Sequence, residues 1–304
     1  MQTTNRILLV RPFRFRKNEE TVVNNYYQQD LEDSSAKEIA EQAVKEFDDF
    51  VAVLQGNGIQ TLVLQDNLEL DTPDSIFPNN VISFHQDKLV FYPMFAENRR
   101  LERNLIKAYL LGENQEHIEW LDYSSFEDQR AFLEGTGCLI LDRVHKKAYC
   151  SISPRASAEL VHQFCLDFDY QPIIFEAFQT VGELRMPIYH TNVMLSIGQS
   201  FAVICLDSID NIQHQNLVLE SLREEQKEII IISEEQVSQF AGNILEVKSS
   251  DNSPVIVMSS QAYQSFHPNQ LQQLEKYGKI IHSPLETIET CGGGSARCMM
   301  AEIF

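Results

Sequence analysis

The chain has 304 residues, 43% of them hydrophobic and 22% charged, a composition typical of a globular protein with a substantial core. Its 24 Lys and Arg residues against 44 Asp and Glu residues give a formal net charge of -20, which argues against nucleic acid and anionic membranes as partners because so acidic a protein repels phosphate groups. No apolar run approaches the ~20 residues that a membrane span needs, and the first strand-like segment is too brief for a signal peptide, so we expect a cytoplasmic protein.

Strands and helices are predicted to alternate from the first residues onward. A strand over residues 6–10 precedes a helix that opens at 34–38 with a capping signature and is stopped by the Gly-Asn-Gly segment at 56–58. A strand over 61–65 and a polar, turn-rich loop over 66–78 follow. The polar segment 13–30 is interpreted either as a lid or as a plain surface loop, and its composition fits both.

A unit of a strand hairpin followed by a helix then recurs. Hairpins are expected at 81–93, 138–152, 193–206 and 244–258, and the helices after them at 98–111, 154–168, 215–226 and 268–277. Together with a looser first unit, these give five hairpin–helix–strand modules about sixty residues apart, a spacing typical of a repeat architecture.

The modules predict how the chain is organised. Because each module starts with a hairpin, the repeats do not form a doubly wound parallel sheet, and no linker rich in Pro, Gly or Ser separates them. We therefore predict a single α/β domain over residues 1–304. In a closed ring of modules the loops would surround one central cavity, and the first and last strands would close the ring.

The cysteines point to one candidate nucleophile. None of the six shows CxxC pairing or a metal-ligand spacing with histidine, so we expect reduced thiols and no metal site. Most such cysteines are small buried hydrophobic side chains. Cys298 differs because it lies four residues after the three glycines at 292–294 and directly before the apolar end of the chain. Glycines let the backbone approach a ligand closely, so this segment is suited to present a thiol.

Two further residues occupy equivalent places in other modules. Glu134 precedes the second hairpin in a Glu-Gly-Thr-Gly segment, and His190 precedes the third. Cysteine-dependent hydrolysis needs a thiolate, an acid or base beside it and a group that orients the base. Singly, the glutamate fits a solvated loop charge and the histidine a core or surface group. In a ring, however, the three positions would converge on the centre, which favours a catalytic set.

The motifs resemble those of a known superfamily. The segment Gly-Gly-Gly-Ser-Ala-Arg-Cys-Met at 292–299 resembles the C-terminal cysteine motif of arginine deiminases, and the segments at Glu134 and His190 are similar to the glutamate and histidine motifs of the same enzymes. These are the guanidine-modifying, five-bladed α/β propeller (pentein) enzymes, which include dimethylarginine dimethylaminohydrolases and amidinotransferases. The resemblance extends over the whole chain. The segments at 10–12, 77–80 and 141–143 look most like the amidinotransferase-like citrulline hydrolases of citrulline utilisation.

The resemblance assigns roles to the three catalytic candidates. It implies that Cys298 is the nucleophile, that His190 is the general acid and base, and that Glu134 orients His190. It implies no cofactor.

The resemblance also implies substrate-binding residues. Arg99 and Arg155 match arginines that grip the α-carboxylate of the substrate, a role suited to the fork of a guanidinium. For each of them a surface cation at the start of a helix is the alternative. Asp74 matches a second carboxylate that binds the substrate.

The sequence departs from its arginine-using relatives at two positions. Those enzymes hold the guanidinium between two carboxylates, whereas this chain has Asn80 and Asn192 in their places. A guanidinium carries only donors and a charge, and burying it without anionic acceptors is costly. A neutral ureido group offers a carbonyl acceptor as well as N–H donors, and an amide can satisfy both. The paired asparagines therefore predict a small ureido substrate and the hydrolysis of L-citrulline to ornithine, carbon dioxide and ammonia through a covalent Cys298 adduct.

Several alternatives stay open. Asp74 can still pair with a cation, so a guanidino substrate is the main rival, as in arginine deiminase, dimethylarginine hydrolase or an amidinotransferase. A binding protein on the same fold is a second alternative. A cysteine peptidase lacks support because no flanking signature of those families is present. Which amine leaves first and whether the protein forms oligomers do not follow from the sequence.

Overall fold

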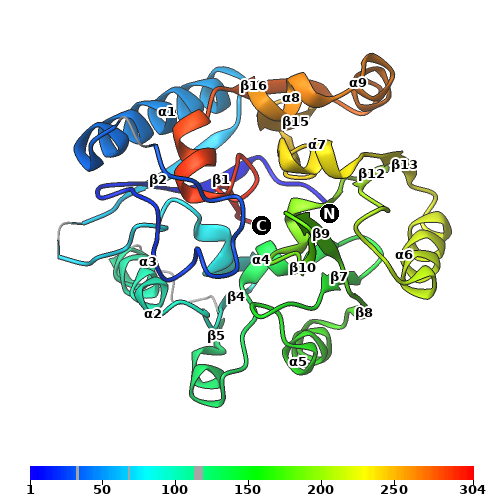
Figure 1. The fold of residues 1–304 in the computed structure, drawn as a ribbon, viewed down its shortest axis with the longest axis horizontal. Helices are drawn as coiled ribbons and strands as arrows, with labels where there is room; N and C mark the ends of the chain where they lie inside the picture. The colour runs from blue at the N-terminus through cyan, green and yellow to red at the C-terminus, as the bar shows by residue number, and fades with distance from the viewer. Residues whose placement is uncertain (32–33, 68, 113–118) are drawn as a thin grey trace.

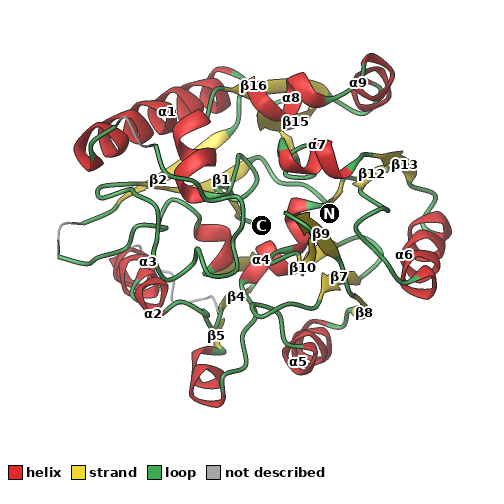
Figure 2. Ribbon diagram, in the orientation of Figure 1, coloured by secondary structure: helices red, strands yellow, loops and turns green. Residues whose placement is uncertain are grey.

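The computed structural model describes residues 1–31, 34–67, 69–112 and 119–304. The chain passes once around a centre, from α1 (Ala36–Gly56) through α5 (Ala158–Phe168) to α9 (Pro268–Glu275), and both termini lie near the middle of the view (Figure 1). The other longer helices, α3 (Glu102–Gly112) and α6 (Ile212–Glu224), also lie on the outside of the ring, while the strands lie nearer the centre (Figure 2).

Five sheets of three strands form the ring, and each has the same topology. An antiparallel pair is extended by a parallel strand, which the chain reaches through a helical crossover on the outside. In order along the ring the strands are β17 (Ala301–Glu302), β1 (Arg6–Arg11) and β2 (Gln60–Gln65); β3 (Ile82–His85), β4 (Lys88–Phe91) and β5 (Glu119–Asp122); β6 (Ile140–Asp142), β7 (Lys147–Ser151) and β8 (Gln171–Phe175); β11 (Leu195–Ile197), β12 (Phe201–Ile204) and β13 (Glu228–Ile231); and β14 (Leu245–Lys248), β15 (Pro254–Ser259) and β16 (Lys279–Ser283). The predicted five-bladed α/β propeller is confirmed.

The two ends of the chain close the ring, as the sequence predicted. β1 pairs in parallel with β2, and on its other edge it pairs antiparallel with β17, with Ile7 opposite Glu302 and Leu8 opposite Ala301. Ile7, Leu8 and Leu9 are fully buried, so both faces of β1 are covered, which explains its continuous apolar run. The C-terminal strand therefore belongs to the first blade.

The first helix shows how local sequence fixes an element. Ser35 caps α1, with its hydroxyl accepting from the backbone N–H of Glu38 at 3.3 Å while the Glu38 carboxylate accepts from the Ser35 N–H at 2.8 Å. The buried residues Ala43, Phe47, Phe50 and Leu54 lie three or four positions apart and form one apolar stripe. This stripe packs the helix against the sheets of the ring, and α1 contacts β2 and β16.

Several elements differ from the prediction. The helix expected at 98–111 is divided into α2 (Glu97–Arg100) and α3, and the strand expected from residue 138 begins at Ile140 because α4 (Gly135–Cys138) precedes it. The helix expected from 154 begins at Ala158, since 153–156 form a turn with mutual backbone hydrogen bonds between Ser153 and Ala156. A hairpin of β9 (Phe178–Val181) and β10 (Leu184–Pro187) between the third and fourth blades was not predicted.

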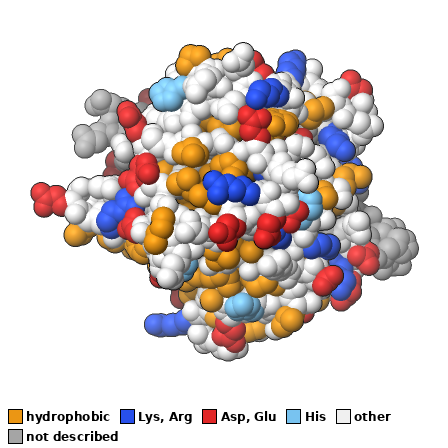
Figure 3. All heavy atoms as spheres, turned by 90° about the vertical axis from the view of Figure 1, so that its right-hand side faces the viewer, with side chains coloured by type: hydrophobic (Ala, Val, Ile, Leu, Met, Phe, Trp, Pro, Cys, Tyr) orange, Lys and Arg blue, Asp and Glu red, His pale blue; other side chains and the backbone are white. Residues whose placement is uncertain are grey.

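The remaining short elements are α7 (Glu234–Ser238), α8 (Ser260–Ser265), the 3-10 turns Pro78–Asn80, Ser124–Gln129 and Thr191–Val193, and the π-helical turn Ile288–Gly292. The face that carries α6 and β13 shows hydrophobic side chains between acidic and basic ones, and exposed Ile212, Leu217 and Ile231 belong to these two elements (Figure 3). In the described part of the chain, no helix combines the length and apolar character needed to cross a membrane.

Candidate active site

The turns that lead into the inner strands converge at the centre of the ring. α4 packs against the turns Pro78–Asn80 and Thr191–Val193, which come from the neighbouring blades. Glycines make this approach possible. Gly135 has a φ of +45°, and a Cβ built there would lie 2.2 Å from the carbonyl oxygen of Asn79. A Cβ at Gly242 in the fifth blade would likewise lie 2.2 Å from the carbonyl oxygen of Val193.

Cys298 lies at this centre, in the turn before β17. Its backbone N–H donates to the carbonyl oxygen of Ser295 at 2.9 Å, and the residue is 2% exposed. Its Sγ accepts hydrogen bonds from Nδ2 of Asn192 at 3.3 Å and from Nδ2 of Asn243 at 3.2 Å. Two neutral amides from adjacent blades therefore hold the sulfur.

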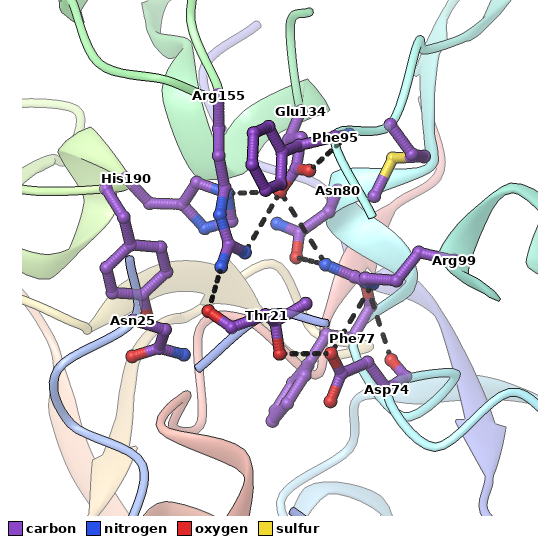
Figure 4. A network of polar contacts seen from close by, with 12 residues as sticks. Thr21, Asn25, Asp74, Phe77, Asn80, Phe95, Arg99, Glu134, Arg155 and His190 are labelled. Atoms are coloured by element: carbon purple, nitrogen blue, oxygen red, sulfur yellow. Dashed lines mark hydrogen bonds and ion pairs between the residues drawn. The ribbon is translucent and has the colours of Figure 1, made fainter. Parts of the chain in front are cut away.

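His190 and Glu134 form a buried pair beside it. His190 Nε2 lies 2.6 Å from Glu134 Oε2, while Glu134 Oε1 accepts from the backbone N–H of Phe95 at 3.0 Å (Figure 4). Glu134 also faces two guanidinium groups, with Nη1 of Arg155 at 3.4 Å and Nη1 of Arg99 at 3.7 Å. The sequence prediction that His190 and Glu134 come together matches this geometry, and their catalytic roles stay predictions.

The environment sets the charges of this pair. Burial by itself would raise the pKa of Glu134, but Arg155, the hydrogen bond with His190 and the charge of Arg99 together lower that pKa below its usual range. Burial lowers the pKa of His190 to about 4, although the hydrogen bond and charge of Glu134 act in the opposite direction. At neutral pH the pair is thus a carboxylate and a neutral imidazole. Nε2 donates to Glu134 in this state, so Nδ1 is left as the basic nitrogen.

Arg99 is embedded in protein contacts. Its Nε and Nη2 donate to the two carboxylate oxygens of Glu102 at 2.9 and 3.1 Å, and Nη1 donates to Oδ1 of Asn80 at 2.9 Å. Nη2 also donates to the carbonyl oxygen of Phe77 at 3.2 Å. Arg99 therefore fixes the amide of Asn80, and to grip a substrate carboxylate it would first have to release one of these partners.

Arg155 is held by the polar segment 13–30. Its Nε donates to Oδ1 of Asn24 at 2.8 Å, and its Nη2 donates to the carbonyl oxygen of Thr21 at 2.9 Å. Figure 4 shows Arg155 and Arg99 approaching Glu134 from two directions. Because its polar partners besides Glu134 come from this segment, Arg155 would gain free donors if the segment moved away.

Two acceptors in the site have no partner among the described residues. Asp74 Oδ1 and Asn192 Oδ1 are both buried and unbonded, whereas Asp74 Oδ2 accepts from Asn18 at 2.8 Å and from Thr21 at 3.2 Å. Burial raises the pKa of Asp74 although Arg99 lies nearby. Buried acceptors left empty are costly, so these two oxygens are suited to N–H donors of a ligand.

The segment 13–30 also closes the site. Asn25 Nδ2 donates to the carbonyl oxygen of Gly292 at 3.2 Å, and Gln28 Nε2 donates to the same oxygen at 3.1 Å. The cavity that remains has a volume of about 10 Å³, enough for about one water molecule. An amino-acid substrate needs more room than this volume offers, and the interpretation of segment 13–30 as a lid stays a prediction.

The structure brings the predicted residues together. Six of them line this small cavity, namely Asp74, Asn80, Arg99, Arg155, His190 and Cys298. Glu134 and Asn192 are bonded to members of that set. Within the described ranges, no cluster of three or more His, Cys, Asp or Glu side chains could hold a metal ion, and all six cysteines carry free thiols.

Sequence reasoning missed Asn243. It lies in the turn before β14, the place in the fifth blade that corresponds to Asn80, Asn192 and Cys298 in other blades. The signal that could have found it was the segment Gly242-Asn243 before the fourth hairpin, because the same position supplies Asn80, Asn192 and Cys298 in three other modules.

Comparisons with known proteins agree with this geometry. A family model described as "N,N dimethylarginine dimethylhydrolase, eukaryotic" matches residues 11–304. A search of curated proteins finds no match.

Solved structures resemble the whole fold. The N-terminal domain of ArgZ, in a form covalently bound to a reaction intermediate, matches with a TM-score of 0.75 at 16% identity, covering 98% of this chain and 97% of that one. The complete ArgZ, an arginine dihydrolase from the ornithine-ammonia cycle in cyanobacteria, matches with a TM-score of 0.76 at 16% identity over 98% of this chain and 40% of that one. DDAH from Pseudomonas aeruginosa, complexed with citrulline, matches with a TM-score of 0.65 at 14% identity over 99% and 100%.

Proposed function

The chain belongs to the N,N-dimethylarginine dimethylhydrolase family, within the guanidine-modifying (pentein) superfamily, and we propose that this hydrolase of carbon–nitrogen bonds acts on the ureido carbon of L-citrulline. The products would be ornithine, carbon dioxide and ammonia. We also propose that residues 1–304 form one catalytic domain, because the two chain ends share the first blade.

The observation that carries the proposal is the set of charges around Cys298. The side chains bonded to its sulfur are the amides of Asn192 and Asn243, and the nearby imidazole is neutral at pH 7. The carboxylate next to the imidazole, Glu134, is already paired with two guanidinium groups. A cationic guanidinium would find no free counter-charge among these side chains at the sulfur, whereas a ureido group needs none.

The amide at position 80 is oriented to suit a carbonyl. Arg99 donates to Oδ1 of Asn80, and Nδ2 of Asn80 donates to Oδ1 of Asn79 at 3.1 Å. One N–H of the Asn80 amide is therefore left to donate to a substrate carbonyl. The unpartnered Oδ1 of Asn192 can accept from the ureido nitrogen. One free donor and one free acceptor match the mixed pattern of a ureido group.

The remaining contacts fit an amino acid. Asp74 Oδ1 lacks a partner and can accept from an α-ammonium group. Arg155 can bind an α-carboxylate once the lid removes Asn24 from its donors. A neutral substrate brings no positive charge to the buried carboxyl groups of Glu102 and Asp74. The site tolerates this because burial raises the pKa of Glu102 to about 7 and that of Asp74 above its ordinary value, which favours the uncharged acid form of both.

The proposed reaction proceeds in two steps. The sulfur of Cys298 attacks the ureido carbon after its proton passes to Nδ1 of His190, and the carbon–nitrogen bond to the first amine breaks as His190 returns that proton. Water then attacks the carbamoyl carbon, with His190 accepting its proton and the carbon–sulfur bond breaking. The carbamate that is released decomposes to carbon dioxide and an amine.

A guanidino substrate is the second candidate, favoured by the free carboxylate oxygen of Asp74 and by the arginine dihydrolase that shares the fold. Purified protein incubated separately with citrulline, arginine and dimethylarginine decides between them by amino-acid analysis. Ornithine from citrulline supports the proposal. Citrulline formed from arginine or dimethylarginine would replace it by the second candidate. If no substrate is turned over, a binding protein becomes the better account.

A further inference from the structure

One side chain holds both the sulfur and the backbone of Cys298. Asn243 is 1% exposed, and its Nδ2 donates to Cys298 Sγ at 3.2 Å and to the carbonyl oxygen of Asn192 at 3.1 Å. Its Oδ1 accepts from the backbone N–H groups of Arg297 at 3.1 Å and of Cys298 at 3.4 Å. Both ends of the amide are therefore used, and their orientation follows from the donors around them.

These contacts join three blades at the nucleophile. Asn243 comes from the turn before β14, Asn192 from the turn before β11, and Cys298 from the turn before β17. The close approach depends on Gly242, since a Cβ there would meet the backbone of the fourth blade. The fold thus brings two amide N–H groups to one sulfur, and among the described residues no charged side chain is hydrogen-bonded to it.

Hydrogen bonds to a thiolate favour the charged form over the thiol. The neutral state of His190 at pH 7 means that the imidazole supplies no positive charge to the sulfur before substrate binds. Preorganised N–H donors can supply this stabilisation in a site that excludes water.

We propose that Asn243 is a positioning residue that, together with Asn192, holds the sulfur of Cys298 between two amide N–H donors and stabilises the thiolate that attacks the substrate. Its carboxamide oxygen meanwhile fixes the backbone turn that aims the sulfur. The proton of the thiol passes to His190. This inference rests on the proposed nucleophilic role of Cys298.

Asn243→Asp distinguishes the role of the amide N–H donor from the role of the carboxamide oxygen. The carboxylate keeps an acceptor for the two backbone N–H groups, but it removes the donor to sulfur and adds a negative charge beside it. Asn57→Asp is the matched control, because Nδ2 of Asn57 donates to a backbone carbonyl, that of Val53 at 2.8 Å, at the far end of α1. Thermal unfolding first establishes that each variant is folded. If Asn243→Asp does not fold, Asn243→Ser takes its place; because it adds no negative charge, the shift should have the same direction and be smaller.

The readout is the rate of Cys298 alkylation by iodoacetamide as a function of pH, followed by peptide mass spectrometry without substrate. Burial raises the pKa of each of the other five cysteines, to about 11 for Cys165 and about 12 for Cys150, and peptide analysis reports the modification of Cys298 separately from theirs. Access through the lid is common to all variants and does not move the midpoint of the profile.

We expect the alkylation midpoint of Asn243→Asp to move up by about one pH unit or more, with an about tenfold slower reaction at pH 7. The control should keep the wild-type midpoint. A merely structural role would change the rate equally at all pH values, and an unmoved midpoint in the folded variant would overturn the inference. Turnover of citrulline is measured separately. If the wild type is inactive on citrulline but Asn243→Asp still moves the alkylation midpoint, the proposed substrate is refuted and the role of Asn243 is not.

Discussion

Gly137 is the position where the smallest change should disturb the site most. It lies in α4, and a Cβ built on it would be 2.4 Å from Nδ2 of Asn80 and 2.9 Å from Nδ1 of His190. Ordinary van der Waals contact begins at 3.4 Å. The single methyl group of Gly137→Ala therefore has to displace the Asn80 amide by about 1 Å and the imidazole by about 0.5 Å, or move α4 itself.

The magnitude follows from these displacements. Overpacking of this kind costs about 1–3 kcal/mol of stability. A misplacement of about 1 Å in a site costs on the order of 10²-fold in rate, so kcat/KM should fall by about that factor while the protein stays folded. Because Nδ1 of His190 is the proposed base, kcat should carry most of the loss.

The assay is ornithine formation from citrulline, with stability measured by urea unfolding. Gly56→Ala is the matched control, since Gly56 ends α1 and a Cβ there meets nothing within 4 Å. We expect the control to keep wild-type kinetics and stability. If Gly137→Ala has full activity, the contacts of Asn80 and His190 do not position the reaction as argued.

Three further predictions concern charges in the site. Glu134→Gln leaves Arg155 and Arg99 buried without their shared counter-ion, so urea unfolding should show a loss of about 3–5 kcal/mol and turnover should fall by about 10²- to 10⁴-fold; wild-type stability would contradict the pairing. Because the pKa of His190 is lowered to about 4 when folded, the unfolded state binds its proton first as the pH falls below about 6.5. The free energy of unfolding should therefore fall by on the order of 3 kcal/mol as the pH falls from about 6.5 to about 4. His190→Gln should remove this pH dependence. Asp74→Asn should raise KM for citrulline by about 10- to 100-fold with little change in kcat, because a charge-assisted hydrogen bond is lost; an unchanged KM would exclude Asp74 from substrate binding.

The fold could be predicted because its signals are local and repeated. Hairpins, caps and apolar stripes recur in each module, and only a ring lets the last strand pair with the first. The short α4 was not predicted from the sequence. Its glycines at 135 and 137 permit the close approach of neighbouring blades, and the strand begins only after it, at Ile140. It also missed the hairpin of β9 and β10, which lies outside the repeat.

The site was predictable as a set of residues and less so as a set of contacts. Equivalent module positions identified Glu134, His190 and Cys298, and the structure places them at one centre. Whether Arg99 faces substrate or protein depends on Glu102, three residues further on, and nothing in their spacing distinguishes a buried pair from an exposed helical one. The lid contacts that occupy Arg155 depend on long-range packing of an irregular segment, for which sequence patterns give no distances.

The central claim is that Cys298 attacks an uncharged ureido carbon. The most direct measurement is ornithine and ammonia formation from L-citrulline by the wild type and by Cys298→Ala, with L-arginine as the competing substrate. The account predicts ornithine from citrulline with the wild type, no turnover with Cys298→Ala, and much slower or no reaction with arginine. Citrulline accumulating from arginine, or a fully active Cys298→Ala, would contradict it.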